Sequence, residues 1–444
     1  MQRTDKYLVI NGTIINADSI AKADVAVSGG KIESVGMIDP ADFPGYETVD
    51  ASGRYLLPGG IDPHVHLALP TPAGNSSDDF VSGSIAALAG GTTSIIDFVT
   101  PRRGQSLIEA LTLRRAEALA SHCNWKLHLG ISEWNEKVAG EVRYCIRHEG
   151  IRSFKAYLAY RDTIGIKYDE LEQLMRVVEP EGGIVLVHCE EGETISRLQR
   201  QFISEGRTNA SFHALSRPKE AEINAIKTVI SLSERTGCPV YIVHVSTGEG
   251  ARAIREAKEK GLNVYGETCI QYLVLNDSVY DPSLPNEKVL PYVISPPIRP
   301  ESERLQLWEE LAKGTFDVVS TDHCPFNLQG QKDAGINDFT KIPNGAGGIE
   351  FRLSLLYSFG VLTRKVSLQQ FVSLASSRSA EIFGWGKTKG KIAARFDADI
   401  VIWNPETTWK ISTEHQFQHC DSNIYEGLKG TGKAEIVFCS GHCF

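Results

Sequence analysis

The chain has 444 residues, of which 42% are hydrophobic, 8% aromatic and 23% charged. This length exceeds one ordinary domain of ~100–200 residues but fits an α/β barrel with a small accessory domain, and the apolar fraction excludes wholesale disorder. The formal net charge is −9, and no basic cluster is longer than Arg102-Arg103 or Arg114-Arg115, which argues against a nucleic-acid partner. No apolar stretch reaches the ~18–20 residues of a membrane span, and we expect no signal peptide.

The nine cysteines are scattered, without a CxxC pair or the spacing of a disulfide scaffold. We therefore expect reduced thiols, several of them packed as small hydrophobic side chains. Reduced thiols are typical of the cytoplasm, which is the location that we predict.

Both ends of the chain contain short segments of alternating apolar and polar residues. Residues 1–55 show such segments between Gly, Asn and Asp turns, and residues 390–444 show the same pattern. Neither end alone has enough strands for a stable sheet, so we expect them to pair into one small β-sandwich. The predicted domains are thus 1–55 and 390–444, which share the sandwich, and a barrel over 56–389.

Between these ends, eight short apolar runs rich in β-forming residues alternate with longer stretches of helical periodicity. Segments 106–122, 168–180 and 217–237 are typical amphipathic helices, and the last has Pro near its start and Gly at its end. Eight such units in about 270 residues predict a (β/α)8 barrel, and a doubly wound open sheet is the alternative. The runs are YLLPGGIDPHVHL, TTSIIDFV, WKLHLGIS, SFKAYLAY, GIVLVHCE, PVYIVHVS, NVYGETC and FDVVSTDHC.

Two long segments inside the barrel region, 276–304 and 327–348, are rich in Pro and Gly. Long loops within a compact enzyme are usually disordered or functional.

Metal-binding side chains recur at the carboxyl ends of the predicted barrel strands. His64 and His66 end the first run, and because residues i and i+2 share a strand face, both imidazoles point the same way. Three further runs end with His188, His244 and Asp322, so four of the twelve histidines lie on the face where barrel active sites are found. This arrangement predicts a metal centre.

These five side chains exceed the three protein ligands of a usual catalytic zinc site. Two metals ~3.5–4 Å apart would use all five but need a bridging anion besides hydroxide. The fourth run offers only Lys155, whose ammonium has no acceptor atom for a cation. A lysine carbamylated by carbon dioxide would supply a carboxylate-like bridge. From the residues alone, a salt-bridged or snorkelling lysine is an equally good interpretation.

A series of motifs, in order along essentially the whole chain, resembles the amidohydrolase superfamily and, within it, dihydropyrimidinases and D-hydantoinases. The most specific part runs from TDHCPF through GQK to DFTKIPNG. The other motifs are LPGGIDPHVH, GGTTSIIDF, FKAYLAY, VHCEEG, YIVHVS, YGETC, SPPIR and DADIVIW.

The resemblance implies two Zn²⁺ ions per subunit, bridged by carbamylated Lys155 and a hydroxide. It assigns His64, His66 and Asp322 to one ion and His188 and His244 to the other.

The resemblance also implies roles in catalysis and substrate binding. The bridging hydroxide would attack the carbonyl of a cyclic amide, with Asp322 as the general base that returns the proton to the leaving nitrogen. Tyr160 would donate a hydrogen bond to the oxyanion, and Ser295 and Asn344 would bind the imide through backbone groups. From the residues alone, Tyr160 is a typical core tyrosine, and Ser295 and Asn344 are typical turn residues.

The implied reaction is hydrolysis of 5,6-dihydropyrimidines, hydantoins or both to N-carbamoyl amino acids. Dihydroorotases carry Arg two residues after the HxH motif, where this chain has Ala68. Loss of that charged contact would weaken binding of a carboxylate by about 2–5 kcal/mol, so a neutral small-molecule ureide is favoured. An allantoinase-like hydrolase is the alternative. A non-catalytic scaffold of the same fold is a more distant one, because such relatives have lost metal ligands that are all present here.

The family resemblance implies a homotetramer, with a dimer as the alternative because relatives continue beyond the position of Phe444 with a tail that packs on a neighbouring subunit. We assign no role to Cys189, His323 and Cys324. Cys189 and His323 directly follow predicted ligands and should therefore point to the opposite strand face.

Overall fold

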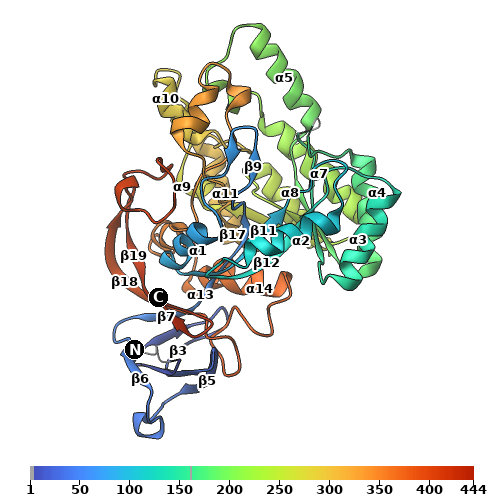
Figure 1. Cartoon of the computed structure of the whole chain (residues 1–444). Coiled ribbons are helices and arrows are strands. Elements are labelled where there is room, and N and C mark those ends of the chain that lie inside the picture. The colour runs from blue at the N-terminus through green and yellow to red at the C-terminus, as the bar shows by residue number, and fades with distance from the viewer. Residues whose placement is uncertain (1–4, 161–162) are drawn as a thin grey trace.

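The computed structural model describes residues 5–160 and 163–444, and in this part of the chain eight parallel strands form a barrel (Figure 1). The spatial order of the strands follows their order in the chain. All eight coincide with the predicted apolar runs. They are β8 (Gly60–Val65), β11 (Thr92–Val99), β12 (Asn124–Gly130), β13 (Ser153–Tyr157), β14 (Ile184–His188), β15 (Val240–Ile242), β16 (Val264–Cys269) and β17 (Val318–Ser320).

Backbone contacts close the ring between the first and the last strand. His66 N donates to His323 O at 2.8 Å, and His323 N donates to His64 O at 3.3 Å. Every residue of β8, β11, β13 and β14 is buried, as expected for parallel strands covered on both faces. The predicted barrel is confirmed, and the open-sheet alternative is wrong.

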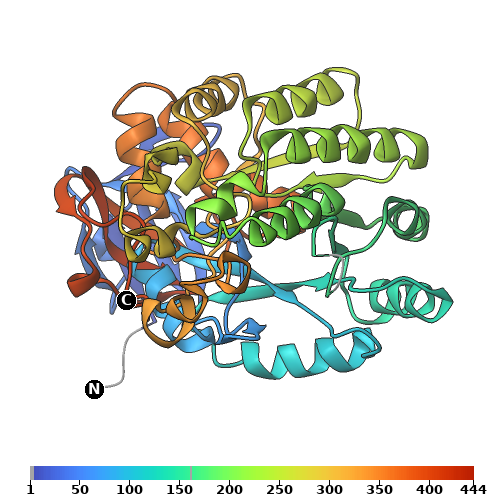
Figure 2. The same ribbon diagram turned by 90° about the horizontal axis from the view of Figure 1, so that it is seen from above.

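Helices cover the outside of the barrel (Figure 2). The predicted helix in 217–237 is present as α7 (Lys219–Thr236). Gly237 directly follows the helix and has φ of 75°, a left-handed conformation that suits glycine. The longer helices are α1 (Phe80–Ala89), α2 (Leu107–Ala118), α3 (Glu136–His148), α4 (Tyr168–Val178), α5 (Gly192–Ser204), α7 (Lys219–Thr236), α8 (Gly248–Glu259) and α11 (Glu301–Ala312). The shorter ones are α6 (Ser211–Leu215), α9 (Ile270–Val274), α10 (Asn286–Val289), α12 (Arg352–Leu356), α13 (Leu368–Val372) and α14 (Arg378–Ile382).

The two chain ends form two further sheets that pack together, as predicted, but one of these sheets is made by the N-terminal end alone, so the expectation that neither end has enough strands for a sheet is wrong (Figure 1). One has the order β5-β4-β1-β6 and the other the order β20-β19-β18-β7-β2-β3, and they share an apolar core that includes Val9, Val25, Ile400 and Phe438. The strands are β1 (Tyr7–Ile10), β2 (Thr13–Ile15), β3 (Ile20–Lys22), β4 (Asp24–Ser28), β5 (Lys31–Gly36), β6 (Glu47–Asp50), β7 (Tyr55–Pro58), β18 (Ile400–Lys410), β19 (Lys429–Cys439) and β20 (His442–Cys443).

The domain boundaries at 55/56 and 389/390 stay a prediction, and residues 1–4 of the first domain lie outside the described residues. A separate two-stranded ribbon, β9 (Pro70–Thr71) with β10 (Gly74–Asn75), follows β8.

The small sheets fix the start of β8. Strand β7 pairs with β18, placing Pro58 opposite Ile400, and continues through Gly59 into β8. Gly59 N donates to Asp399 O at 2.8 Å, and Ser376 Oγ donates to Gly59 O at 2.6 Å. A Cβ atom at position 59 would lie 2.1 Å from Thr93 Oγ1, so only glycine fits here. The strand that carries His64 and His66 is therefore anchored by the C-terminal part of the chain.

The segment between β18 and β19 reaches the loops at the carboxyl end of the barrel. Phe417 N donates to Glu350 Oε2 at 2.7 Å, and His419 N donates to Asp78 Oδ1 at 2.9 Å. The segment 327–348 contacts the segment between β18 and β19, because Asp421 N donates to Asn327 Oδ1 at 3.0 Å. The long loop 327–348 is thus held by specific contacts.

Glu350, which accepts from Phe417 N, makes the attachment of the segment between β18 and β19 sensitive to pH. Burial raises the pKa of Glu350 to about 7, against a usual value of 4.5. The folded state therefore binds the extra proton between these values, and its stability falls as pH rises through that window. We expect Glu350→Gln, which keeps an acceptor oxygen, to raise the melting temperature by about 1–2 °C at pH 8 and to have no effect near pH 4.5. Calorimetry of both proteins checks this, with the exposed Glu414→Gln as control; an equal effect at both pH values would contradict it.

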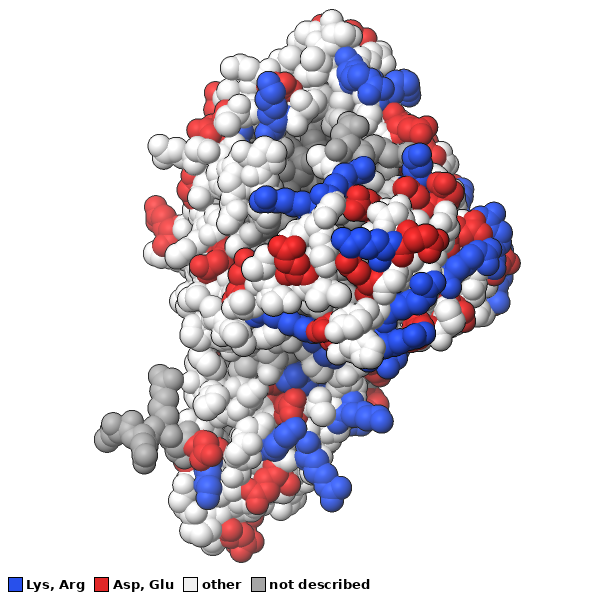
Figure 3. Space-filling model, turned by 45° about the vertical axis from the view of Figure 1, so that its right-hand side comes forward, with Lys and Arg blue, Asp and Glu red and all other residues white. Residues whose placement is uncertain are grey.

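Acidic and basic side chains are interspersed over the face shown in Figure 3. No helix in residues 5–160 and 163–444 is long and apolar enough to cross a membrane. All nine cysteines lie among the described residues, and none of them forms a disulfide bond there.

Candidate active site

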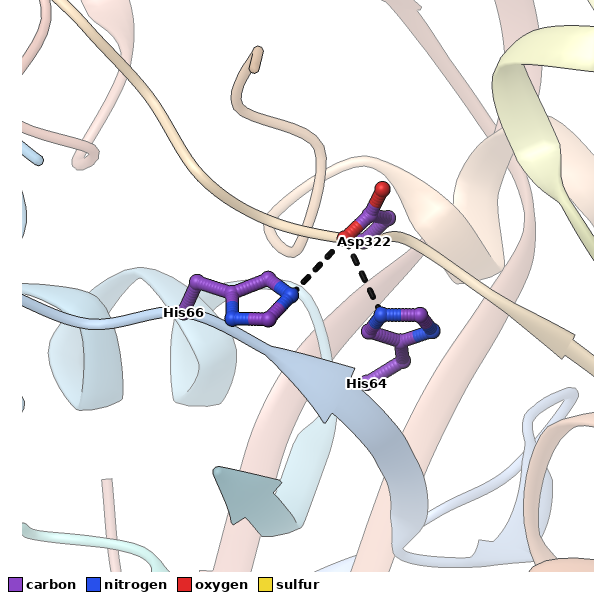
Figure 4. A group of neighbouring side chains, drawn as sticks. All are labelled: His64, His66 and Asp322. Carbon is purple, nitrogen blue, oxygen red and sulfur yellow. Dashed lines mark ion pairs between the residues drawn. The ribbon is translucent and has the colours of Figure 1, made fainter. Parts of the chain in front are cut away.

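The carboxyl end of the barrel brings together the first three predicted metal ligands (Figure 4). His64 and His66 come from the end of β8, and Asp322 follows β17. His64 Nε2 lies 3.1 Å and His66 Nε2 3.2 Å from Asp322 Oδ1. One possible ligand atom from each of the three residues lies within 4.8 Å of the other two.

The other two predicted histidines lie beside this group. His188 ends β14 and His244 follows β15, and their ring centroids are 4.5 Å apart. The ring centroid of His244 is also 5.5 Å from that of His64. All four imidazoles are buried. The structure thus gathers them at one place, although they come from three different strands.

Buried carboxylates orient two of these imidazoles. His64 Nδ1 lies 2.7 Å from Glu267 Oε1, and His188 Nε2 lies 2.8 Å from Glu190 Oε2. Glu267 also accepts from Tyr241 Oη at 2.9 Å. A carboxylate bonded to one ring nitrogen fixes the ring and leaves the other nitrogen for a metal.

Sequence reasoning did not assign roles to Glu190 and Glu267. Their positions at the carboxyl end of the barrel could have been found, because Glu190 is two residues after His188 and Glu267 lies near the end of the seventh run, but their partners could not.

The carboxylates give the site unequal proton affinities. Although burial disfavours the imidazolium, Glu267 and Asp322 raise the pKa of His64 to about 9. Burial lowers the pKa of His66 to about 4. Burial alone would raise the pKa of Asp322, but the neighbouring His64 and His66 hold it well below its usual value. Near neutral pH the imidazole of His64 therefore favours the cationic form and that of His66 the neutral form, and both lie beside negatively charged Asp322.

Two buried ring nitrogens have few partners, which suits the site to a cation. His64 Nε2 contacts only Asp322 Oδ1, without the geometry of a hydrogen bond, and His66 Nδ1 forms no hydrogen bond with the described residues. Buried polar atoms normally have partners, and their lack of one is costly. Imidazole nitrogens beside a carboxylate are preferred ligands of zinc and related divalent metals. The residues present therefore fit a metal ion.

Lys155 lies on β13 and is 1% exposed. Its Nζ is 5.1 Å from the ring centroid of Phe98 and 5.2 Å from that of Tyr157. Across the part of the chain that is described, no carboxylate pairs with it, so the salt-bridged interpretation has no partner here. Burial lowers the pKa of Lys155 to about 8.

Tyr160, Ser295 and Asn344 meet next to the histidines. The ring centroid of Tyr160 lies 5.4 Å from that of His188, and the Arg217 guanidinium lies 5.2 Å above the Tyr160 ring. Burial raises the pKa of Tyr160, and side-chain hydrogen bonds with Ser295 and Asn344 oppose this shift. The three residues named for substrate binding are therefore neighbours, although the sequence separates them widely.

Several residues around the site have left-handed backbone conformations. Ala68, Tyr160, His244 and Asp322 have φ of 45°, 58°, 41° and 52°. Such values are uncommon outside glycine and concentrate at functional sites. They aim side chains in directions that regular strands would not allow.

The neighbouring cysteines and His323 have structural environments. Cys189 and Cys324 are buried, and burial raises the pKa of each thiol well above its usual value, which disfavours the nucleophilic thiolate. His323 Nε2 lies 3.0 Å from Asp78 Oδ2, and its Nδ1 accepts from Gly348 N at 3.1 Å. Both ring nitrogens of His323 are thus already used.

Comparisons with known proteins agree with this geometry. A sequence model of the amidohydrolase family matches residues 55–443. The chain is 41% identical to a D-hydantoinase of Geobacillus stearothermophilus, over 98% of this chain and 92% of the relative. It is 38% identical to a dihydropyrimidinase of Dictyostelium discoideum, over 100% of this chain and 88% of the relative.

A solved structure gives the same result. The crystal structure of dihydropyrimidinase from Brevibacillus agri superposes with a TM-score of 0.96 at 39% identity, covering 99% of this chain and 94% of the other. The chain belongs to the amidohydrolase family, in the branch that contains D-hydantoinases and dihydropyrimidinases.

Proposed function

We propose that this chain is a zinc-dependent enzyme that hydrolyses the cyclic amide bond of 5,6-dihydropyrimidines, hydantoins or both to N-carbamoyl amino acids. One observation carries the proposal. Four buried histidines and Asp322 converge at the carboxyl end of the barrel, in a chain 41% identical to a D-hydantoinase.

Two zinc ions would be held by the residues gathered there. His64, His66 and Asp322 would hold one ion, His188 and His244 the other, and carbamylated Lys155 would lie between them. The convergence of His64 Nε2 and His66 Nε2 on Asp322 Oδ1 supports the first assignment, and the burial of Lys155 without a carboxylate partner supports the last. When bound, such ions polarise a carbonyl group and make hydroxide available near neutral pH.

The chain's own residues would position the ring and move the proton. Asp322, beside both histidines of β8, would accept the proton of the attacking water and return it to the leaving ring nitrogen. The Tyr160 hydroxyl would donate a hydrogen bond to the carbonyl oxygen as negative charge develops there. Backbone groups of Ser295 and Asn344 would hold the imide. Burial of the site keeps competing water away from these contacts.

The residue after Leu67 supports a neutral ring as substrate. Ala68 has no charge with which to bind a carboxylate, and its φ of 45° turns the chain toward the β9–β10 ribbon. The same reasoning disfavours dihydroorotate. We further infer a cytoplasmic location from the scattered, reduced cysteines, and a homotetramer, with a dimer as the alternative, from the branch resemblance.

The test is the initial rate of ring opening by zinc-loaded enzyme, with dihydrouracil, hydantoin, allantoin and dihydroorotate supplied separately. We expect rapid opening of dihydrouracil or hydantoin and little turnover of the other two. Faster opening of allantoin would replace the proposal with an allantoinase activity. Inactivity toward all four with zinc bound would contradict it.

A further inference from the structure

Lys332 is a buried lysine in the long segment 327–348, and the proposed reaction does not use it. Its side chain is 1% exposed and among the largest fully buried side chains of the structure. Nζ donates to Val293 O at 3.0 Å and to Pro343 O at 3.2 Å. It thus contacts two backbone segments that lie far apart in the sequence.

No carboxylate compensates this amine. In residues 5–160 and 163–444, no aspartate or glutamate forms an ion pair with Lys332, which is unusual for a buried lysine. Burial lowers the pKa of Lys332 to about 7. Both the ammonium and the neutral amine have at least two N–H groups, so both can donate to the two carbonyls. The carbonyl contacts, rather than an ion pair, account for its placement.

The two carbonyls belong to the segments that carry the proposed imide-binding residues. Val293 is two residues before Ser295, and Pro343 directly precedes Asn344. Gly345 N also donates to Val293 O at 3.0 Å, so the two segments meet at this point.

A close backbone approach leaves these segments little freedom. Gly345 has φ of 153°, and a Cβ atom there would lie 2.2 Å from Cys324 O. Cys324 is two residues after Asp322. The backbone at Gly345 therefore passes directly beside the residues that follow β17, the last barrel strand.

We propose that Lys332 is a positioning residue that fixes the Val293–Ser295 and Pro343–Asn344 segments relative to each other, so that their backbone groups bind the substrate ring. The inference rests on the proposed function, because it assumes that Ser295 and Asn344 contact the imide. Lys332 itself does not touch the substrate.

The main test compares Lys332→Met with wild type. Methionine has a similar length but cannot donate to either carbonyl. We expect KM for the ring that wild type opens to rise about 10-fold, with kcat changed less than about 3-fold, because ring binding rather than proton transfer is affected. Zinc content should equal that of wild type. Lys332→Arg, which retains donors, should recover part of the KM.

Lys389→Met is the matched control. Lys389 is also a buried lysine, but it pairs with Asp397 and Asp399 near the small sheets. We expect this variant to lower the melting temperature and leave KM unchanged. An unchanged KM in folded Lys332→Met, or an equal rise in Lys389→Met, would overturn the inference.

Amide hydrogen exchange gives a readout that does not require turnover. Peptides covering 290–296 and 340–348 should exchange at least about 10-fold faster in Lys332→Met and at the wild-type rate in Lys389→Met. Unchanged exchange would overturn the inference. If Lys332→Met does not fold, Lys332→Gln is judged by the same criteria, because its shorter amide cannot reach both carbonyls. If wild-type enzyme opens none of the rings, the proposed function is contradicted. The exchange measurement still tests whether Lys332 holds the two backbone segments together.

Discussion

Replacing Asp322 with Asn is expected to lower kcat by about 10³-fold while the protein remains folded. The amide has nearly the same shape as the carboxylate but cannot accept a proton near neutral pH. Asp322 is the carboxylate next to both histidines of β8, and its side chain is 20% exposed, so it is accessible to a bound ring. The measurement is kcat together with zinc content by elemental analysis, because Asp322 is also a proposed ligand.

The control for this variant is Asp317→Asn. Asp317 lies just before the same strand, β17, at the opposite end of the barrel, where it pairs with Lys258 and Arg378. We expect this change to lower the melting temperature with kcat unaffected. Loss of turnover in Asp322→Asn at full zinc content would support proton transfer by Asp322. Near-normal kcat at full zinc content would exclude Asp322 as the base.

Replacing Lys155 with Met is expected to lower both zinc content and turnover, the latter by about 10³-fold or more. The four imidazoles would then surround two cations without the carboxylate-like bridge that the carbamate would supply. Native mass spectrometry of the intact wild-type protein, kept in bicarbonate, should give a mass that exceeds the mass calculated from the sequence by one carbon dioxide. Lys155→Met should not show this increment.

Lys126→Met is the control for Lys155. Lys126 lies on the neighbouring strand β12, where its Nζ donates to Phe383 O at 2.6 Å, away from the histidines. This variant should keep the mass increment, the zinc and the activity. A fully active, zinc-loaded wild type with an unmodified Lys155 would exclude the carbamate.

The barrel could be predicted from the sequence because each strand has a local sequence pattern that can be recognised by itself. A parallel strand buried on both faces is a short apolar run, and the runs of β11 and β14 can be recognised without knowing their neighbours. The convergence of His64, His188 and His244 follows from the same reasoning, since the carboxyl ends of all barrel strands lie on one face.

Features that depend on contacts between distant segments could not be predicted from the residues in this way. Nothing local in Glu267 shows that it meets His64, and no local sequence pattern marks the left-handed backbone at Asp322. The two carbonyl contacts of Lys332 also depend on tertiary structure. In contrast, the pairing of the chain ends could be predicted from their shared pattern of short alternating strands, although the N-terminal end also forms the sheet β5-β4-β1-β6 by itself.

The junction at Gly59 has a consequence for the order in which the molecule is completed on the ribosome. His64 and His66 are made early, but β7, which leads into their strand, pairs with β18, which is made near the end of synthesis. One edge of β8 pairs with β11, which follows it closely in the chain, but the other edge waits for His323. A nascent chain therefore carries these two histidines on a strand that is paired at one edge only until His323 and β18 have emerged. Zinc capture should thus follow translation of the whole barrel rather than accompany it, and bound zinc would mark chains whose two ends have met.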